Sequence, residues 1–215
     1  TTLRAGLAES YEISPDGLTY TFKLRPGVKF HNGREMTAED VKYSLDRVTD
    51  PATQSPGAGF FGSIAGFEAA GPDGLSGVEV VDPLTVKITL SRPDATFLHV
   101  MALNFASVVP KEAVDALGSD FGKQPVGTGA FRLGEWTLGQ RLVFEKNADY
   151  WREGVPYLDS VVFEVGQEPV VALLRLQNGE VDVPGDGIPP AKFTEVMGDP
   201  AQAAHEHPPP QVAST

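Results

Sequence analysis

The sequence predicts a mixed α/β fold, in which helices are interspersed among strands rather than alternating with them strictly. Residues 18–24 alternate apolar and polar side chains and are rich in β-branched and aromatic residues, as expected of a half-buried strand. Apolar residues at helical spacing follow over residues 41–48. Residues 78–93 then resemble a hairpin built around an Asp-Pro turn. This order favours mixed sheets with helices packed on them.

The first strand and the first helix have clear boundary signals. The turn "SPDG" at 14–17 precedes the strand, and an Asn-Gly turn at 32–33 closes a second short extended piece. Thr37 is placed to cap a helix, and Asp40 follows three residues later as a short form of the capping box. We therefore expect the helix to begin at Thr37.

Residues 51–77 are rich in Gly, Pro, Ala and Ser, yet they also contain three phenylalanines. Phe60, Phe61 and Phe67 need apolar surroundings, so we expect a long ordered loop with one helical turn rather than a flexible linker.

The remaining elements follow from the same rules of periodicity and capping. We expect Val86, Ile88 and Leu90 to share one face of the hairpin. The predicted elements after it are a short helix at 94–103, an extended stretch at 104–110, a helix at 111–117 ending at Gly118, paired strands at 130–136 and 140–147, a strand at 157–166, a helix at 168–178 with Gly179 after its end, a short strand at 180–185, a helix at 189–197 and an extended tail at 205–215.

Composition narrows the class of protein. The chain has 215 residues and a net charge of −12, without a basic patch, which argues against nucleic acid as a partner. No apolar run is long enough to span a membrane, and the absence of Cys excludes disulfides and thiolate sites. Because the chain begins without Met, we expect it to be a processed or trimmed piece of a longer protein.

No catalytic constellation stands out in the sequence. There is no G-x-S-x-G elbow, no Walker loop and no G-x-G-x-x-G. His205 and His207 are the only close histidine pair; they would suit a metal, or simply a solvated tail, and no third ligand lies nearby in sequence. We therefore expect no catalytic residues, no cofactor and no metal site.

The stretch "PVGTGAFRL" at 125–133 places a glycine-rich turn before a strand. A phosphate cradle requires a helix after such a turn, so this chemistry is excluded. Gly127 and Gly129 permit a positive φ or the close approach of another backbone. Two interpretations stay open: a tight crossing into the next strand, or a crossing between lobes beside a cleft.

Three stretches together resemble one family, the extracytoplasmic solute-binding proteins of the oligopeptide, dipeptide and nickel type (family 5), which feed ABC importers. They are residues 7–51, which contain "YTFKLRPGVKFHNG" and "TAEDV", residues 125–165, and "ALLRLQNGEVDV" at 172–183. Their order and spacing also match, over nearly all of residues 3–197. Asn32 stands where the family often has Asp, and Tyr11 where it often has Trp.

The resemblance implies a periplasmic-binding-protein-like class II fold, present here as an N-terminal fragment without the second lobe. Residues 1–124 would form a small accessory domain with an edge of the first lobe, 125–200 part of that lobe, and 201–215 an extended tail toward the missing lobe. Apolar surface exposed by the truncation would then favour dimerisation.

The resemblance also implies the function. The protein would bind di- or oligopeptides in an interlobe cleft and deliver them to the ABC permease subunits, as a bacterial periplasmic or extracytoplasmic protein, with a lipid anchor upstream of Thr1 left open. Nickel or metal chelates, opines and oligosaccharides are alternative ligands, and a surface module that binds another protein is an alternative class. An enzyme is not expected. The residues implied at the cleft are Asn104 as a polar contact, Phe105 as an apolar wall, Ala106, Thr128 and Gly129.

Overall fold

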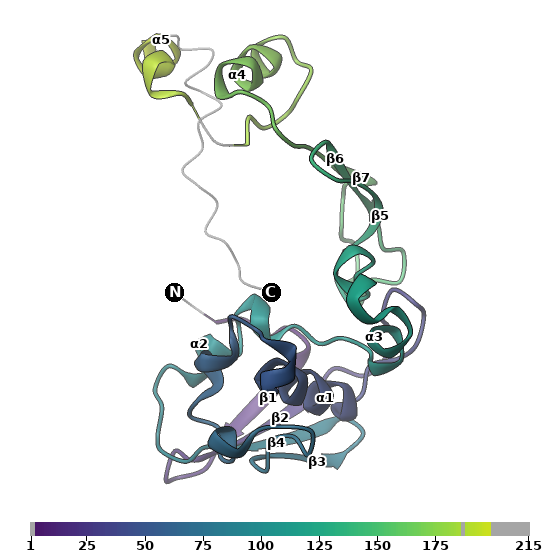
Figure 1. Ribbon diagram of the computed structural model, residues 1–215, viewed down its shortest axis with the longest axis vertical. Coiled ribbons are helices and arrows are strands. Elements are labelled where there is room, and N and C mark those ends of the chain that lie inside the picture. Colours follow the sequence, from purple (N-terminus) through teal and green to yellow (C-terminus); the bar gives the residue numbers. More distant parts are fainter. Residues whose placement is uncertain (1–2, 186–187, 199–215) are drawn as a thin grey trace. The chain divides into compact units, whose positions relative to one another are not determined.

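The computed structural model describes residues 3–185 and 188–198 (Figure 1). These residues form two compact units: the first comprises 3–134 and 144–161, and the second comprises 135–143, 162–185 and 188–198. Both helices and sheets are present, so the mixed α/β class is confirmed. The predicted division into 1–124, 125–200 and 201–215 stays a prediction, and the tail with His205 and His207 lies outside the described residues.

A four-stranded antiparallel sheet lies at the centre of the first unit (Figure 1). Its strands are β1 (Ala8–Ile13), β2 (Thr19–Leu24), β3 (Val78–Asp82) and β4 (Thr85–Thr89), in the order β1-β2-β4-β3. In the register, Tyr20 faces Ile88 and Phe22 faces Val86, and all four side chains are buried. The predicted strand at 18–24 and the predicted hairpin are confirmed.

Strand β1 is not indicated by the sequence pattern. It lies at the edge of the sheet, and most of its side chains are exposed, so no apolar alternation marks it. Tyr11 and Ile13 are large and apolar, but both are about half exposed. What makes the segment a strand is its pairing with β2.

Helix α1 (Ala38–Thr49) packs against β3 and β4. Val41, Leu45 and Val48 lie on its buried face, as their helical spacing predicts. The helix begins after Thr37, whose backbone N–H donates to the Asp40 carboxylate at 2.8 Å. The predicted start and the capping box are therefore confirmed.

The segment after α1 is ordered, as predicted, but it contains three short 3₁₀ helices rather than one helical turn. These are η1 (Pro51–Thr53), η2 (Ala58–Phe61) and η3 (Phe67–Ala69). Phe61 is fully buried and Phe67 packs against the core, whereas Phe60 remains 51% exposed. Two of the three phenylalanines thus hold the segment on the core.

The first unit continues with α2 (Phe97–Val100), η4 (Asn104–Ala106), α3 (Lys111–Leu117) and η5 (Gly118–Lys123). Helix α3 ends at Gly118, which has a φ of +52°, as predicted. The prediction of an extended stretch at 104–110 is wrong for its first three residues, which form η4. The N–H of Ala106 donates to the Leu103 carbonyl at 3.0 Å, and that of Ser107 to the Asn104 carbonyl at 3.2 Å, so the backbone turns there.

Three further strands form a second sheet, in the order β5-β6-β7. They are β5 (Phe131–Thr137), β6 (Arg141–Lys146) and β7 (Ser160–Glu164), as the sequence predicts. The helical elements of the second unit are α4 (Pro169–Gln177), η6 (Pro190–Lys192) and α5 (Phe193–Gly198). Gly179 has a φ of +73° just after α4, in the predicted capping position.

The short strand expected at 180–185 is wrong. Within the described residues, no strand pairs with this segment, and a strand without a partner leaves its backbone groups unpaired. The N–H of Glu180 instead donates to the Arg175 carbonyl at 2.9 Å. The side chain of Arg175 forms ion pairs with Glu164 and Glu180, so the end of α4 determines the local path of the chain.

None of the helices in the described ranges is long and apolar enough to cross a membrane.

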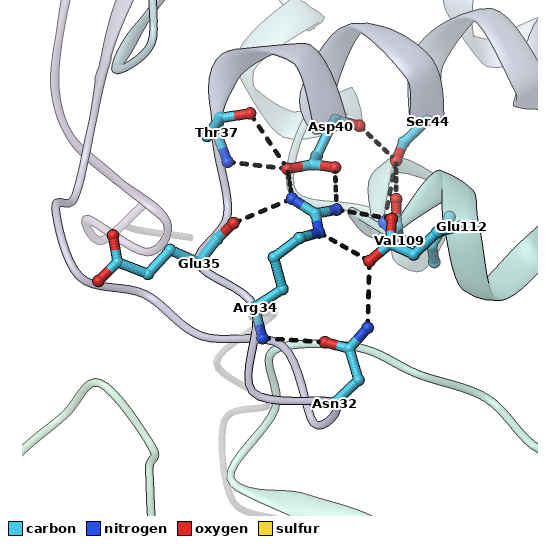
Figure 2. Close-up of polar contacts among 8 residues, drawn as sticks. All are labelled: Asn32, Arg34, Glu35, Thr37, Asp40, Ser44, Val109 and Glu112. Atoms are coloured by element: carbon cyan, nitrogen blue, oxygen red, sulfur yellow. Dashed lines mark hydrogen bonds and ion pairs between the residues drawn. The ribbon is translucent and has the colours of Figure 1, made fainter.

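A network around Arg34 connects the 30–37 loop to the starts of α1 and α3 (Figure 2). The guanidinium donates from Nη2 and Nη1 to both carboxylate oxygens of Asp40, at 2.6 and 3.0 Å. Its Nε and Nη2 donate to the two carboxylate oxygens of Glu112, at 2.7 and 3.0 Å. Asn32 also donates to Glu112, at 3.1 Å. One cation therefore neutralises two carboxylates on different helices.

The network reaches the interior through Asp40 and Ser44, both of which are buried. The Ser44 hydroxyl donates to the Asp40 carbonyl at 2.7 Å and accepts from the N–H of Val109 at 2.9 Å. A buried carboxylate without a partner would strongly destabilise the fold. Arg34 is therefore needed to neutralise the buried carboxylate of Asp40.

The network makes stability depend on pH through Glu112. Its hydrogen bond with Arg34 lowers the pKa of Glu112 to about 2, from an ordinary value of 4.5. Since the folded-state pKa is depressed, the stabilisation is present above about pH 4.5 and is lost as the pH falls toward 2. We expect Glu112→Gln to be less stable than the wild type at pH 6, with a difference that shrinks toward pH 2.5, as measured by urea unfolding.

The matched control is Glu68→Gln, because Glu68 is exposed and forms no ion pair with any described residue. A difference in the free energy of unfolding between wild type and Glu112→Gln that stays constant from pH 6 to 2.5 would contradict the prediction.

Candidate functional site

The glycine-rich segment 125–130 leads into strand β5, as the sequence predicts. Neither Gly127 nor Gly129 has a positive φ. A Cβ atom at Gly127 would meet open space, and one at Gly129 would lie 3.5 Å from the Phe131 carbonyl oxygen. Neither a positive φ nor a lack of room for a Cβ atom therefore requires glycine at these two positions. Hydrogen bonds from two distant residues, His31 and Asn147, fix the segment instead.

His31 makes three hydrogen bonds with this segment. Its backbone N–H donates to the Gly127 carbonyl at 2.8 Å, and Nδ1 accepts from the Gly127 N–H at 3.3 Å. Its Nε2 lies 3.1 Å from the Gly129 carbonyl oxygen. A neutral imidazole with its proton on Nε2 satisfies both ring contacts, because Nδ1 must accept and Nε2 must donate.

The surroundings of His31 favour this neutral form. Burial of the ring lowers its pKa, and the positive charge of Arg132 acts in the same direction. The hydrogen bond to the Gly129 carbonyl acts in the opposite direction but is weaker than the effect of burial, so the pKa of His31 lies below the ordinary 6.5.

Asn147, which follows β6, also holds this segment. Its side-chain Nδ2 donates to the Gly129 carbonyl at 2.9 Å, and its backbone N–H donates to the Ala130 carbonyl at 2.8 Å. The side chain is buried. The sequence does not indicate the roles of His31 and Asn147, because His31 belongs to the "HNG" turn and nothing local links either residue to Gly129.

Two of the predicted site residues, Thr128 and Gly129, lie on this fixed segment. Thr128 is half-buried and Gly129 is exposed. The Gly129 carbonyl is engaged by both His31 and Asn147, whereas the Thr128 hydroxyl has no hydrogen-bond partner among the described residues.

The other three predicted site residues form the single turn η4. Asn104 is exposed, while Phe105 and Ala106 are partly buried and pack against the core of the first unit. The Phe105 ring stacks on Phe60 with ring centres 5.7 Å apart. Val126 packs on the same core, but no hydrogen bond in the described ranges joins η4 to residues 128 and 129.

The loop at 146–155 borders an open depression of about 470 Å³. Of its two aromatic residues, Tyr150 and Trp151, the latter is approached by the guanidinium groups of Arg25 and Arg152, 4.6 and 5.0 Å from the ring centre. These cations compete with any ligand for the ring. Among the residues that the structure describes, no group of three or more His, Asp or Glu side chains is arranged to hold a metal ion.

The comparison with known families gives the class of protein, that of the extracytoplasmic solute-binding proteins. Residues 2–213 match the family described as bacterial extracellular solute-binding proteins, family 5 Middle. The chain belongs to this family. The resemblance carried by residues 7–51, 125–165 and 172–183 is thereby confirmed, and so is the expectation of a binding protein rather than an enzyme, at the level of the family.

Among individual proteins, the chain is similar to the glutathione-binding protein GsiB of Escherichia coli O1:K1, with 38% identity over 178 residues. This match covers 83% of the chain and 33% of the relative, so the chain spans about a third of the length of the curated relatives it matches.

Solved structures show the same class II fold. The oligopeptide-binding protein OppAIV of Borrelia burgdorferi matches with a TM-score of 0.83 and 29% identity, over 92% of this chain and 41% of that one. Haemophilus influenzae OppA in complex with RPPGFSPFR matches with a TM-score of 0.82 and 27% identity, over 91% of this chain and 40% of that one. DppA of Helicobacter pylori in complex with the peptide STSA matches with a TM-score of 0.75 and 31% identity, over 91% of this chain and 40% of that one.

The packing of η4 gives a prediction about stability. A Cβ atom at Gly57 would lie 2.2 Å from the Phe105 ring, although the φ of Gly57, −91°, would accept alanine. We expect Gly57→Ala to lower the free energy of unfolding by about 1–3 kcal/mol, because the ring must leave its place. Urea unfolding measures this.

Gly59→Ala is the control, since a Cβ atom there would meet nothing within 4 Å. Equal stability of the two variants would show that Phe105 is not held as described.

Proposed function

We propose that the protein is the ligand-binding component of a bacterial ABC importer and that its ligand is a short peptide or a peptide-like molecule. The observation that carries this proposal is the 38% identity over 178 residues with a glutathione-binding protein, since glutathione is itself a modified tripeptide. Two structural matches that are complexes with peptides give further support.

The two candidate segments fit this ligand class. Peptide main chain is recognised by backbone N–H and carbonyl groups, which tolerate any side chain. In the segment 127–130, Gly129 is exposed and Thr128 is half-buried, so their N–H groups could serve in this way, and Thr128 adds a hydroxyl. In η4, Asn104 would supply a polar contact, while Phe105 and Ala106 would form an apolar wall. All five residues remain proposals as ligand contacts.

Partners and location follow from the same proposal. The protein would meet the ABC permease subunits on the outer side of the membrane, in the periplasm or at the cell surface, with or without a lipid anchor. Large apolar side chains in the second unit are exposed, among them Leu138 and Val183, at 82% and 73%. Dimerisation through such surface stays a prediction.

The first experiment identifies the natural ligand. The tagged protein is purified from its producing bacterium at the length that its gene encodes, and bound small molecules are released with acid and identified by mass spectrometry. We expect short peptides or glutathione-like thiols. A sugar, an opine or a metal chelate would overturn the peptide proposal and leave the family unchanged.

A protein partner instead of a small molecule would favour the interaction module, for which the exposed Phe60 would be the first residue to test. Phe60→Ser should then weaken capture of a protein partner, and because Phe60 also stacks on Phe105, the peptide affinity of the variant is measured beside it.

A further inference from the structure

The backbone of residues 127–130 can be accounted for group by group. At Gly127 the carbonyl accepts from His31 and the N–H donates to the His31 ring. The carbonyl of Gly129 faces two donors, His31 Nε2 and Asn147 Nδ2. The Ala130 carbonyl accepts from the Asn147 backbone. The carbonyl acceptors at Gly127, Gly129 and Ala130 are thus engaged inside the protein, whereas no described residue donates to the carbonyl of Thr128.

The donors in the middle of the segment are not engaged in this way. Throughout residues 3–185 and 188–198, no hydrogen bond uses the N–H of Thr128, the N–H of Gly129 or the Thr128 hydroxyl. Gly129 is exposed and Thr128 is half-buried, so a ligand from solvent can reach these groups.

We infer that His31, in its neutral Nε2–H form, and Asn147 are positioning residues that leave this segment with more free hydrogen-bond donors than free carbonyl acceptors toward its ligand. They engage the carbonyl of Gly129 and leave the N–H groups of Thr128 and Gly129, with the Thr128 hydroxyl, facing an acceptor. The matching ligand group is a carbonyl or carboxylate oxygen of a peptide main chain. The ligand part of this inference rests on the proposed function.

The choice of tautomer is central to the inference. With the proton on Nδ1, the ring would present a donor to the Gly127 N–H and an acceptor to the Gly129 carbonyl, and both contacts would be lost. An imidazolium would lose the Gly127 contact alone. The segment is therefore held in place by one protonation state of one side chain.

The first test reads the tautomer of His31 directly, without any ligand. Long-range ¹H–¹⁵N NMR of the histidine rings at pH 7.5 distinguishes Nε2–H from Nδ1–H, and His31→Asn assigns the signal. We expect the Nε2–H form. An Nδ1–H form would overturn the positioning role.

The second test measures affinity by calorimetry, with reduced glutathione and the tetrapeptide Ser-Thr-Ser-Ala as probes and the protein at the length that its gene encodes. Thr128→Val removes the hydroxyl and keeps the shape, whereas Thr128→Ser keeps the hydroxyl. We expect Thr128→Val to weaken binding about tenfold, as for one lost hydrogen bond, and Thr128→Ser to bind within about threefold of the wild type. Equal affinities for the two variants would overturn the donor role of the hydroxyl.

Variants of His31 separate positioning from folding. His31→Ala should weaken binding about tenfold, whereas His31→Asn should recover most of the affinity, because its Oδ1 can take the place of Nδ1 as acceptor while Asn147 still serves Gly129. Urea unfolding of both variants accompanies the titration. Affinities that simply follow the unfolding midpoints would show a structural role only.

The amide signals of the segment provide a check on the geometry. On peptide addition, the N–H signals of Thr128 and Gly129 should shift more than that of Gly127, which His31 already holds. The reverse order would contradict the inference. If the wild type binds neither probe and carries no peptide from the cell, the proposed function fails, and the tautomer measurement still decides whether His31 holds the segment as described.

Discussion

The structure of the first unit depends on how one buried carboxylate is neutralised. Asp40 stands at the start of α1, almost fully removed from water, and Arg34 supplies the opposite charge. Because the same guanidinium also binds Glu112 at the start of α3, the loop that carries Arg34 is held against two helices. His31 belongs to this loop, three residues before Arg34. The position of the imidazole that holds the glycine segment therefore derives from the neutralisation of Asp40.

The candidate site is consequently anchored on the core of the first unit. Phe105 reaches the core from η4, and Val126 reaches it just before the glycine segment. Between these apolar contacts, the polar groups that a ligand would meet come from backbone and short side chains. Such a site has little conformational freedom to lose when a ligand binds, which favours recognition by main-chain groups.

Much of the fold is predictable because the signals are local. Alternation in β2 and β4 and the helical spacing of Val41, Leu45 and Val48 each report a buried face within a few residues. The failures are at places where distant groups decide. Edge strand β1 depends on its pairing with β2, and the η4 turn depends on the packing of Phe105 against the core. Gly129 is held by His31, which is 98 residues away in sequence. The five site residues themselves came from the family resemblance and not from any local pattern.

The occupied imidazole of His31 also bears on metal chemistry. A transition-metal ion binds imidazole through a nitrogen lone pair, and the single lone pair of the neutral ring, on Nδ1, already accepts from Gly127. A nickel ion or nickel chelate that sought this histidine would first have to release the glycine segment. The hydrogen bond that holds the segment in place thus uses the lone pair that a metal ion would need, and both ring nitrogens of His31 are engaged by the protein's own backbone.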